Sequence, residues 1–399
     1  MPPNSTIAQP RIGFDARLIG AFGIGRYISG LLPGLGGLLG PRLTVFTQRH
    51  DAALVRAQVG GSARLVPVDA PPYRLAEQAI LPGVLARAQL ALVHFPHYNL
   101  PFLYRGPFVV TIHDLFPFDF PDIHSGPLPR AVNQSLTRQA VRRATRVITP
   151  SRATARALTE RFPGSDARVS AIPEAADERF NPARDATAET AWQARLGIRP
   201  PYVFYLGQWK TYKNLPLLIE AFSMLLQTHP QVQLALAGDD PRHPEVRRAA
   251  DRLPAGSVVF PGRLPDAAIP DLYRGAAMLI LPSRAEGFGL PVMEAMACGV
   301  PIVCSDLPVL REIAEGVATF CDPASPTEFA RAMATTVDEP SPAARRDRGL
   351  ERAGRYSWDS AAERTVALYE EVLQPGLVRA PLEEDPDPRQ DQDLQVKRQ

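Results

Sequence analysis

The stretch Ser283-Arg-Ala-Glu-Gly-Phe-Gly-Leu-Pro-Val-Met-Glu-Ala-Met-Ala-Cys-Gly299 predicts the end of a strand, a glycine turn and a helix. The short apolar run 276–282, bounded by Pro, is typical of a buried strand. Pro291 opens the helix-forming run, at a position where its missing N–H costs nothing. The glycines of Glu286-Gly-Phe-Gly289 let the backbone bend tightly and approach a ligand. The N–H groups of Phe288 to Leu290 should then face outward at the positive end of the helix, which predicts a phosphate site.

Two carboxylates, Glu286 and Glu294, flank this predicted anion site. Because a carboxylate repels phosphate, each is expected to bind a neutral, hydroxyl-rich part of the same ligand. A nucleotide sugar has such a part at both ends of its diphosphate, a hexose at one end and a ribose at the other. The alternative is an ordinary strand, turn and helix with two solvated glutamates, since glycine turns are common in doubly wound sheets.

Length and composition limit the class of protein. A chain of 399 residues suits two domains, and a hydrophobic fraction of 45% is typical of a soluble globular protein. The net charge of +2 is far from the large positive charge that is typical of nucleic-acid-binding proteins. We therefore expect no nucleic-acid partner.

The cysteines and the N-terminal residues indicate a compartment. Cys298, Cys304 and Cys321 are odd in number and lack metal-ligand spacing, so we interpret them as small buried groups in a reducing environment. No apolar run is long enough to span a bilayer, and Met1 to Pro10 lacks a signal-peptide pattern. A cytoplasmic protein is expected, and peripheral contact with the inner face of the plasma membrane stays open.

Lysine is rare and clustered. The chain has 44 lysines and arginines, but lysine occurs only as Lys210, Lys213 and Lys397. Two of the three lie in one loop, at the carboxyl end of the predicted strand 202–206. This suggests that a compact, flexible ammonium group is needed there, and chance clustering is the alternative.

The N-terminal half opens with a similar local pattern. Strand 11–16 is followed by a glycine-rich loop, Gly20 to Gly25, and a helical run from Arg26, which favours a doubly wound α/β unit. Further short apolar strands are predicted at 42–46, 90–95, 108–112 and 146–149. Their spacing, with helix-like stretches between several of them, indicates a mostly parallel sheet.

Histidines follow two of these strands. His113 and Asp114 come at the carboxyl end of strand 108–112, where open α/β sheets bind ligands. Histidine can act near neutral pH or donate a hydrogen bond to a sugar hydroxyl or a phosphate. His94 and His97 form a second candidate rim. For each histidine the alternative is a structural role.

Residues 130–168 carry many arginines, opposed only by Glu160 and Asp166. One interpretation is contact with an anionic acceptor or a membrane surface. The other is a solvated helix face in an arginine-rich chain.

The second half again alternates strands and helices. Segment 181–198 is polar and Ala/Glu-rich and is expected to link two domains. Strands are predicted at 202–206, 232–237, 258–260, 276–282, 301–304 and 318–320, with helices at 327–337 and 358–373. The loops that bear Lys210 and Lys213, Gly238, Gly262 and Glu286 should therefore open on one edge of one sheet.

Glu286 through Glu294 resembles the paired-glutamate signature of retaining GT-B glycosyltransferases of family 4, the glycosyl transferases group 1. The similarity covers nearly all of 11–373. Its other motifs are Gly23-Ile-Gly-Arg-Tyr27, Thr111-Ile-His-Asp114, Val147-Ile-Thr-Pro-Ser151, Tyr205-Leu-Gly207, Lys213-Asn214, Ala237-Gly238, Phe260-Pro-Gly262, Pro282-Ser283 and Gly299-Val-Pro-Ile-Val303. Each motif alone is weak, but all of them in this order are highly specific.

The resemblance implies an α/β protein with the GT-B fold, two Rossmann-like doubly wound domains that face each other across a cleft. The acceptor-side domain is expected at 11–180, the linker at 181–198 and the nucleotide-sugar-binding domain at 199–357. A terminal helix at 358–374 is expected to cross back to the N-terminal domain. The ends, 1–10 and 375–399, are expected to be a disordered leader and tail.

The resemblance also implies residue roles. Lys213 would neutralise the diphosphate, Glu286 would lie beside the donor sugar, and His113 would close over it from the other domain; these are the predicted catalytic residues. The predicted donor-binding residues are Gly207, Lys210, Gly238, Gly262, Arg263, Gly287, Phe288, Gly289, Leu290 and Glu294, with Glu294 on the ribose hydroxyls. The predicted acceptor or phosphate loop is Gly23, Gly25, Arg26 and Tyr27. No metal ligand is expected.

Two places depart from the family pattern. Many relatives have Arg where this chain has Gln208 or Tyr212, so Lys210 is expected to supply the second positive charge. Where many relatives have Asn-Gly, this chain has Glu174-Ala175, which leaves the interdomain contacts there open.

The implied reaction is hexosyl transfer with retention, from GDP-mannose or a UDP-hexose to a glycan or lipid-linked acceptor. The nucleotide sugar is a substrate, so no cofactor is expected, and lysines with helix amides would replace Mg²⁺. A GT-B epimerase or phosphorylase would share the fold, and a dinucleotide-dependent oxidoreductase would need a fuller glycine fingerprint. A non-catalytic nucleotide-sugar-binding protein is the non-enzyme alternative.

Overall fold

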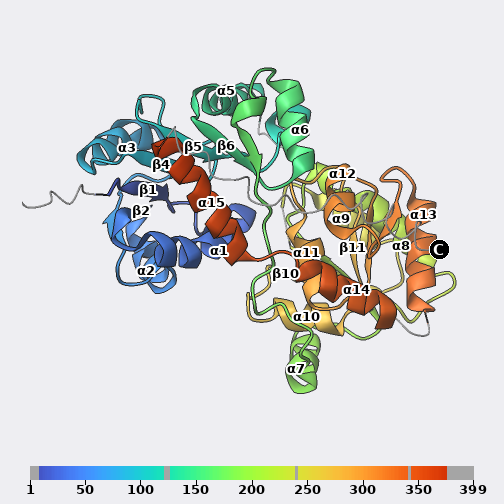
Figure 1. Cartoon of the computed structure of the whole chain (residues 1–399). Coiled ribbons are helices and arrows are strands. Elements are labelled where there is room, and N and C mark those ends of the chain that lie inside the picture. Colours follow the sequence, from blue (N-terminus) through green and yellow to red (C-terminus); the bar gives the residue numbers. More distant parts are fainter. Residues whose placement is uncertain (1–8, 121–125, 239–240, 340–342, 375–399) are drawn as a thin grey trace, which may run out of the picture. The chain divides into compact units, whose positions relative to one another are not determined.

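The computed structural model describes residues 9–120, 126–238, 241–339 and 343–374 (Figure 1). The described residues form two compact units. The first takes in those of Met1–Asp119, His124–Glu174 and Trp358–Gln399, and the second those of Phe120–Ile123 and Ala175–Ser357. The chain therefore returns to the first unit after Ser357. The predicted tail, 375–399, and most of the predicted leader lie outside the described residues.

A parallel sheet of seven strands forms the centre of the first unit, in the order β3-β2-β1-β4-β5-β6-β7. The strands are β1 (Ile12–Asp15), β2 (Leu43–Thr47), β3 (Arg64–Pro67), β4 (Leu92–Phe95), β5 (Phe108–Thr111), β6 (Arg146–Thr149) and β7 (Val169–Ala171). β1, β2, β4 and β5 are buried along their whole length, as expected for strands covered on both faces. The sequence pattern predicts no strand at β3, because this edge strand has exposed Arg64 and Pro67 at its ends.

The helices of the first unit are α1 (Phe22–Leu39), α2 (Ala52–Val59), α3 (Leu75–Arg87), α4 (Phe116–Asp119), α5 (Pro127–Arg143), α6 (Arg152–Arg161) and α15 (Trp358–Leu373). The structure corrects one boundary, because α1 begins at Phe22 and not at Arg26. Gly23 and Gly25 therefore lie in the first turn of a helix. Gly25 is required by packing, since a Cβ there would clash with the carbonyl oxygen of Ile19.

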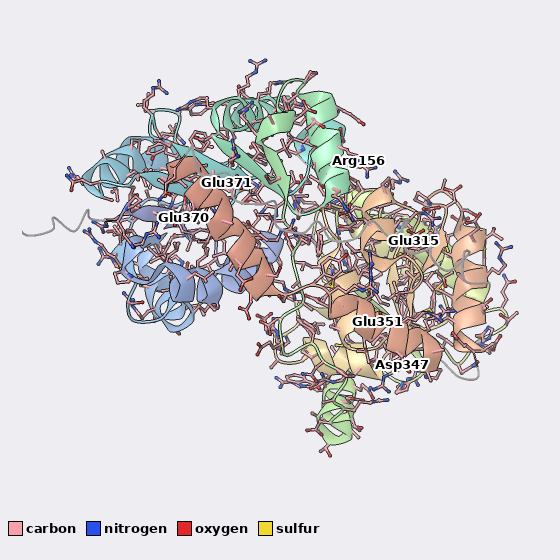
Figure 2. All side chains as sticks on the ribbon, viewed as in Figure 1. Arg156, Glu315, Asp347, Glu351, Glu370 and Glu371 are labelled. Carbon is pink, nitrogen blue, oxygen red and sulfur yellow. The ribbon has the colours of Figure 1, made fainter. Side chains whose placement is uncertain are left out.

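Helix α15 packs along α1 inside the first unit. Ala362 of α15 shares the core with Leu31 of α1. Glu370, labelled in Figure 2, forms a 2.8 Å ion pair with Arg42. The terminal helix is therefore part of the first hydrophobic core.

A buried hydrogen-bond network joins α1 and α15 to the sheet. His94 of β4 lies 2.6 Å from the Tyr369 hydroxyl through Nδ1 and 2.8 Å from the Thr111 hydroxyl through Nε2. The Tyr27 hydroxyl lies 2.9 Å from the same Thr111 oxygen. All four side chains are buried. His94 and Tyr27 thus form hydrogen bonds with other buried polar groups inside the core. For His94 this is the structural role that the sequence left open as the alternative to a ligand contact.

Replacing Gly30 with Ala is expected to destabilise the first unit by about 1–3 kcal/mol, the usual result of overpacking. A Cβ at Gly30 would overlap the Trp358 indole at the start of α15. Gly37 is a matched control on the same helix because a Cβ there meets nothing. Gly37→Ala should leave stability unchanged or raise it by up to about 1 kcal/mol. Urea unfolding compares the two variants, and equal midpoints would contradict close packing of α15 on α1.

The second unit contains a parallel sheet of six strands in the order β10-β9-β8-β11-β12-β13. The strands are β8 (Tyr202–Leu206), β9 (Gln233–Ala237), β10 (Val258–Gly262), β11 (Met278–Leu281), β12 (Ile302–Ser305) and β13 (Thr319–Cys321). The strand order reverses between β8 and β11. Ligands of doubly wound sheets bind beside such a switch point, at the carboxyl ends of the strands.

The helices of the second unit are α7 (Ala186–Leu196), α8 (Leu215–Leu225), α9 (Pro244–Ala250), α10 (Ile269–Gly275), α11 (Leu290–Ala297), α12 (Pro308–Ala314), α13 (Pro326–Val337) and α14 (Ala343–Ala353). β11 and α11 confirm the predicted strand and helix around the glycine turn, with Pro291 in the first turn of α11. Segment 181–198 is more than a linker, because it contains α7, which packs against α10. Asp185 caps α7, and Gly197 ends it in a left-handed conformation, so the helix signals were present in a polar segment.

No helix in the described ranges is long and apolar enough to cross a membrane.

Candidate active site

Lys213 and Glu286 form a buried ion pair at the carboxyl edge of the second sheet. The distance from Nζ to Oε1 is 2.7 Å, and the side chains are 11% and 8% exposed. Lys213 follows β8 and Glu286 follows β11, so the pair bridges the switch point. The ammonium group also lies 5.3 Å from the centre of the Tyr212 ring. The two charges therefore neutralise each other, although the sequence assigned them to different parts of a ligand.

The amino end of α11 begins directly after Glu286. Gly289 is the N-cap residue at φ 103°, a left-handed conformation that favours glycine, and no side chain caps the helix. A Cβ at Gly289 would also approach Leu310 to 2.7 Å. The first turn of α11 thus presents backbone N–H groups and the positive helix end next to the ion pair, which suits an anion.

Glu294 lies one turn into α11 and is only 2% exposed. Its Oε2 accepts a 3.0 Å hydrogen bond from the hydroxyl of Tyr273 on α10. Glu286 is also buried, so the alternative of a glycine turn with two solvated glutamates is wrong. The sequence does not predict a role for Tyr273, because nothing in its local pattern links it to α11.

The glycines at the ends of β8, β9 and β10 bring three loops into close backbone contact. Gly238 has φ 104°, and a Cβ there would clash with the carbonyl oxygen of Gly207. The N–H of Gly238 donates to the Gly262 carbonyl at 2.8 Å. Arg263 follows as an exposed residue. These contacts place the three predicted glycines on one sheet edge, as the sequence indicated.

Two further polar groups at this edge are buried without a protein partner. The indole N–H of Trp209 and the hydroxyl of Ser283 have no hydrogen-bond acceptor or donor among the described residues. Trp209 follows β8 and Ser283 follows β11. Buried polar groups normally have partners, so both are candidates to contact a ligand or a water molecule.

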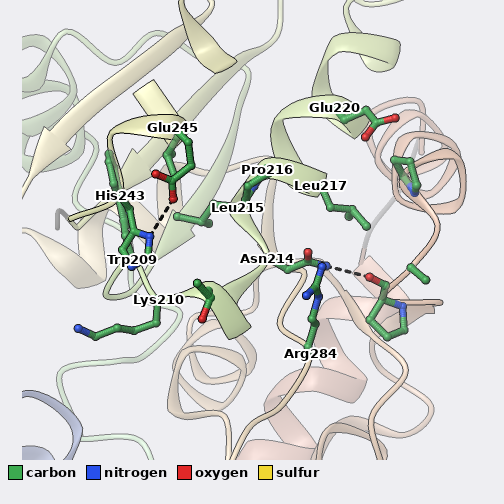
Figure 3. Close-up of a pocket in the computed structure, with 15 residues that line it drawn as sticks. Trp209, Lys210, Asn214, Leu215, Pro216, Leu217, Glu220, His243, Glu245 and Arg284 are labelled. Carbon is green, nitrogen blue, oxygen red and sulfur yellow. Dashed lines mark hydrogen bonds and ion pairs between the residues drawn. The ribbon is translucent and has the colours of Figure 1, made fainter. Parts of the chain in front are cut away.

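A cavity of about 660 Å³ lies at the start of α8 (Figure 3). Its lining includes Lys210, Asn214, His243 and Arg284, but the ion pair of Lys213 is not part of it. The Asn214 side chain donates to the Pro323 carbonyl at 2.8 Å, which holds the loop in place. Lys210 and Lys213 therefore face different surroundings, and a shared role on one diphosphate stays a prediction.

His113 is held through both ring nitrogens inside the first unit. Nε2 donates to the Pro96 carbonyl at 2.9 Å, and Nδ1 lies 3.2 Å from Oε1 of Glu174. Burial opposes the charged ring, but the hydrogen bonds and charges of Glu174, Pro96 and Asp114 outweigh it and raise the pKa of His113. Glu174, a departure from the family pattern, thus has a local partner. Donation from His113 to a sugar requires one of these hydrogen bonds to break.

The four residues of the predicted loop differ in how far they are buried. They are Gly23, Gly25, Arg26 and Tyr27. Gly23 is exposed and Arg26 is partly buried, whereas Gly25 and Tyr27 are buried. The Tyr27 side chain belongs to the core network, so any ligand contact of this segment falls on Gly23 or Arg26.

His97 extends the polar edge of the first unit. Its Nδ1 lies 2.9 Å from the hydroxyl of Tyr73, and its ring packs 3.8 Å from that of Tyr98. Arg17, Asp15 and Glu77 form a buried ionic cluster at the same edge. The sequence does not predict this cluster, because Glu77 lies 60 residues from Arg17 in the chain.

The first unit is expected to lose stability in mild acid. Burial, and then the nearby charge of His113, lower the pKa of His94 and His97 to about 3. In the unfolded chain these rings bind protons below about pH 6.5, so the unfolded state binds more protons and stability falls as pH falls from about 6.5 towards 3. The raised pKa of His113 adds no slope there, because this ring is protonated in both states.

The slope should be about 1.4 kcal/mol per pH unit for each lowered histidine. Urea unfolding between about pH 6.5 and about pH 5 measures it. His94→Gln should halve the histidine contribution to the slope. An unchanged slope in His94→Gln would show that His94 is already protonated in the folded protein.

Comparison with protein families covers both units. The model for glycosyl transferases group 1 matches residues 188–353, and that for glycosyltransferase family 4 matches residues 22–180. The chain belongs to the group 1 glycosyltransferases. The family resemblance in the sequence is thereby confirmed.

Relatives of this glycosyltransferase differ in their named reactions. O-antigen chain mannosyltransferase B of Escherichia coli is 28% identical over 292 residues, 70% of this chain and 74% of that relative. D-inositol 3-phosphate glycosyltransferase of Kineococcus radiotolerans is 25% identical, and the match covers 93% of this chain and 94% of that relative. The structure of Anabaena HepE in complex with UDP-glucose aligns with a TM-score of 0.73 and 20% identity, over 91% of this chain and 100% of that chain. This structural likeness confirms the GT-B fold.

Proposed function

We propose that this glycosyltransferase moves a mannosyl or glucosyl group from a nucleoside diphosphate sugar to a glycan or lipid-linked acceptor, with retention and without a metal. The observation that carries the proposal is the Lys213–Glu286 pair beside the uncapped amino end of α11. A cation, backbone N–H donors and a carboxylate at one switch point suit a diphosphate next to sugar hydroxyls. The mannosyltransferase relative and the neighbour with UDP-glucose support this class of donor.

The ion pair suggests how the donor binds. A diphosphate offers Lys213 a doubly charged partner in place of one carboxylate. Glu286, released from Lys213, can then accept hydrogen bonds from the donor sugar. Glu294, oriented by Tyr273, is proposed to take the ribose hydroxyls. Lys213 and Glu286 would thus exchange one shared contact for two contacts with the ligand.

In the proposed reaction, the acceptor oxygen bonds to the anomeric carbon as the bond from that carbon to the diphosphate oxygen breaks. The leaving diphosphate takes the acceptor proton. Lys213 and the N–H groups of Phe288 to Leu290 would stabilise the negative charge that grows on the diphosphate. Attack on the face from which the diphosphate leaves gives retention.

A ligand screen followed by a product assay tests this function. Thermal unfolding is measured with UDP, GDP and ADP sugars in the presence of EDTA, because a ligand that binds only the folded state raises its stability. The stabilising donor is then incubated with candidate acceptors, and NMR of the product reports the anomeric configuration. Inversion, or activity only with added metal, would contradict the proposal. Isomerised donor without acceptor would indicate an epimerase, and binding without any turnover a non-catalytic protein.

A further inference from the structure

Helices α3 and α5 of the first unit, labelled in Figure 1, and the loop 102–106 carry large apolar side chains that are exposed. They are Leu75 (91% exposed), Ile80 (41%), Phe102 (41%), Leu103 (67%), Leu128 (73%) and Val132 (44%). Single exposed apolar residues are common, whereas several on segments that hydrogen bonds link to one another indicate an interaction surface.

Hydrogen bonds hold the loop to both helices. The N–H of Phe102 donates to Oε1 of Gln78 on α3 at 2.8 Å. Its carbonyl accepts from Nη1 of Arg143 at 3.0 Å and from Nε2 of Gln139 at 3.3 Å, both on α5. The backbone beneath Leu103 is therefore anchored, although the Leu103 side chain is exposed. We call these three segments together the α3–α5 surface.

The α3–α5 surface is strongly basic. From 74 to 87, 102 to 106 and 127 to 143 the only acidic residue is Glu77, which is buried against Arg17. The same segments contain Arg74, Arg87, Arg105, Arg130, Arg138, Arg142 and Arg143. Burial and then repulsion from Arg105 lower the pKa of Arg143. Like charges are thus held close together with no exposed carboxylate in these segments to offset them.

We propose that the α3–α5 surface binds a bilayer that contains anionic phospholipid. The exposed leucines and Phe102 enter the interface between headgroups and acyl chains, and the arginines contact the lipid phosphates. This combination fits a lipid surface better than a protein partner, because each of the three segments carries both exposed apolar side chains and arginines. The proposed contact involves α3, residues 102–106 and α5. It leaves out the later part of the arginine-rich segment 130–168, where Arg161 pairs with Asp119.

Vesicle co-sedimentation of the full chain tests the proposal without donor or acceptor, so its outcome is independent of glycosyl transfer. Phosphatidylcholine vesicles are compared with vesicles that also contain phosphatidylglycerol. Binding should require the anionic lipid and weaken as salt is added. Leu103→Ser should lower the partition coefficient about tenfold, the scale of burying one leucine. Arg105→Gln should lower it about fivefold, the scale of one cation near an anionic surface.

Matched controls distinguish binding through this surface from non-specific binding to vesicles. Leu54→Ser removes a leucine that is 49% exposed on α2 of the same unit, and Arg64→Gln removes an arginine from the edge strand β3. Both should bind as the parent does, and unchanged thermal unfolding confirms that all four variants fold. Equal binding to neutral vesicles, or parental binding by Leu103→Ser, would overturn the proposal. Concentration-dependent dimerisation that Leu103→Ser abolishes, without vesicle binding, would instead assign the surface to a second copy of the chain.

Discussion

Replacing Lys213 with Ala is expected to lower turnover by about 100-fold or more, the scale of losing one group that stabilises charge in the transition state. Lys213 is the cation paired with Glu286 at 2.7 Å, beside the amino end of α11. Without it, the helix N–H groups would have to stabilise the leaving diphosphate without the adjacent cation. Initial rates with the donor found by the ligand screen give kcat and KM. A Lys213→Ala variant with near-parental kcat would remove Lys213 from the mechanism.

The same substitution leaves Glu286 buried without its cation, which costs about 3–5 kcal/mol in comparable pairs. Lost activity must therefore be separated from lost folding. The double variant Lys213→Met/Glu286→Gln keeps the side-chain volumes and removes both charges, so its stability should return towards that of the parent. Its kcat should stay low. Lys210→Ala, in the same loop but beside the cavity at α8, should reduce turnover less than Lys213→Ala.

Arg17→Met is expected to destabilise the first unit by about 3–5 kcal/mol, because it leaves two buried carboxylates without a cation. The Arg17 side chain is 1% exposed. Its Nε and Nη2 donate to Asp15 at 2.8 and 2.7 Å, and Nη2 also donates to Glu77 at 2.6 Å. Glu77 in turn accepts from the side chain of Asn99 at 2.9 Å and the N–H of Tyr73 at 2.8 Å. One guanidinium thus holds the strand β1, helix α3 and two loops together.

Arg49→Met is the matched control for Arg17→Met. Arg49 and Asp69 also form a 2.8 Å pair, but their side chains are 74% and 66% exposed. An exposed pair contributes at most about 1 kcal/mol. Urea unfolding, with hydrogen exchange followed in β1 and α3, measures both variants. Similar losses in the two would show that burial does not govern the strength of the Arg17 cluster.

Much of the fold follows from local sequence. Continuous apolar runs predict the central strands, because strands covered on both faces have no polar side. The glycine turn and Pro291 predict the start of α11, since both act within a few residues of the backbone that they constrain. The edge strand β3 and helix α7 lack the apolar patterns typical of buried elements, so their composition did not predict a strand or a helix.

The sequence also placed the predicted site residues on the right elements. Lys213, Gly238, Gly262 and Glu286 follow parallel strands of one sheet, and the carboxyl ends of parallel strands meet at one edge. That inference needs only strand order and direction. It does not require knowledge of any side-chain contact.

The sequence by itself determined two doubly wound units, the family, and the glycine turn between Glu286 and Glu294. Only the tertiary structure decided which groups pair: Lys213 with Glu286, Glu294 with Tyr273, and His113 with Glu174. These partners come from different elements, and their contacts depend on how helices and loops pack over a sheet. Periodicity and local motifs report the conformation of a segment, whereas burial and pairing of charges arise only when distant segments meet.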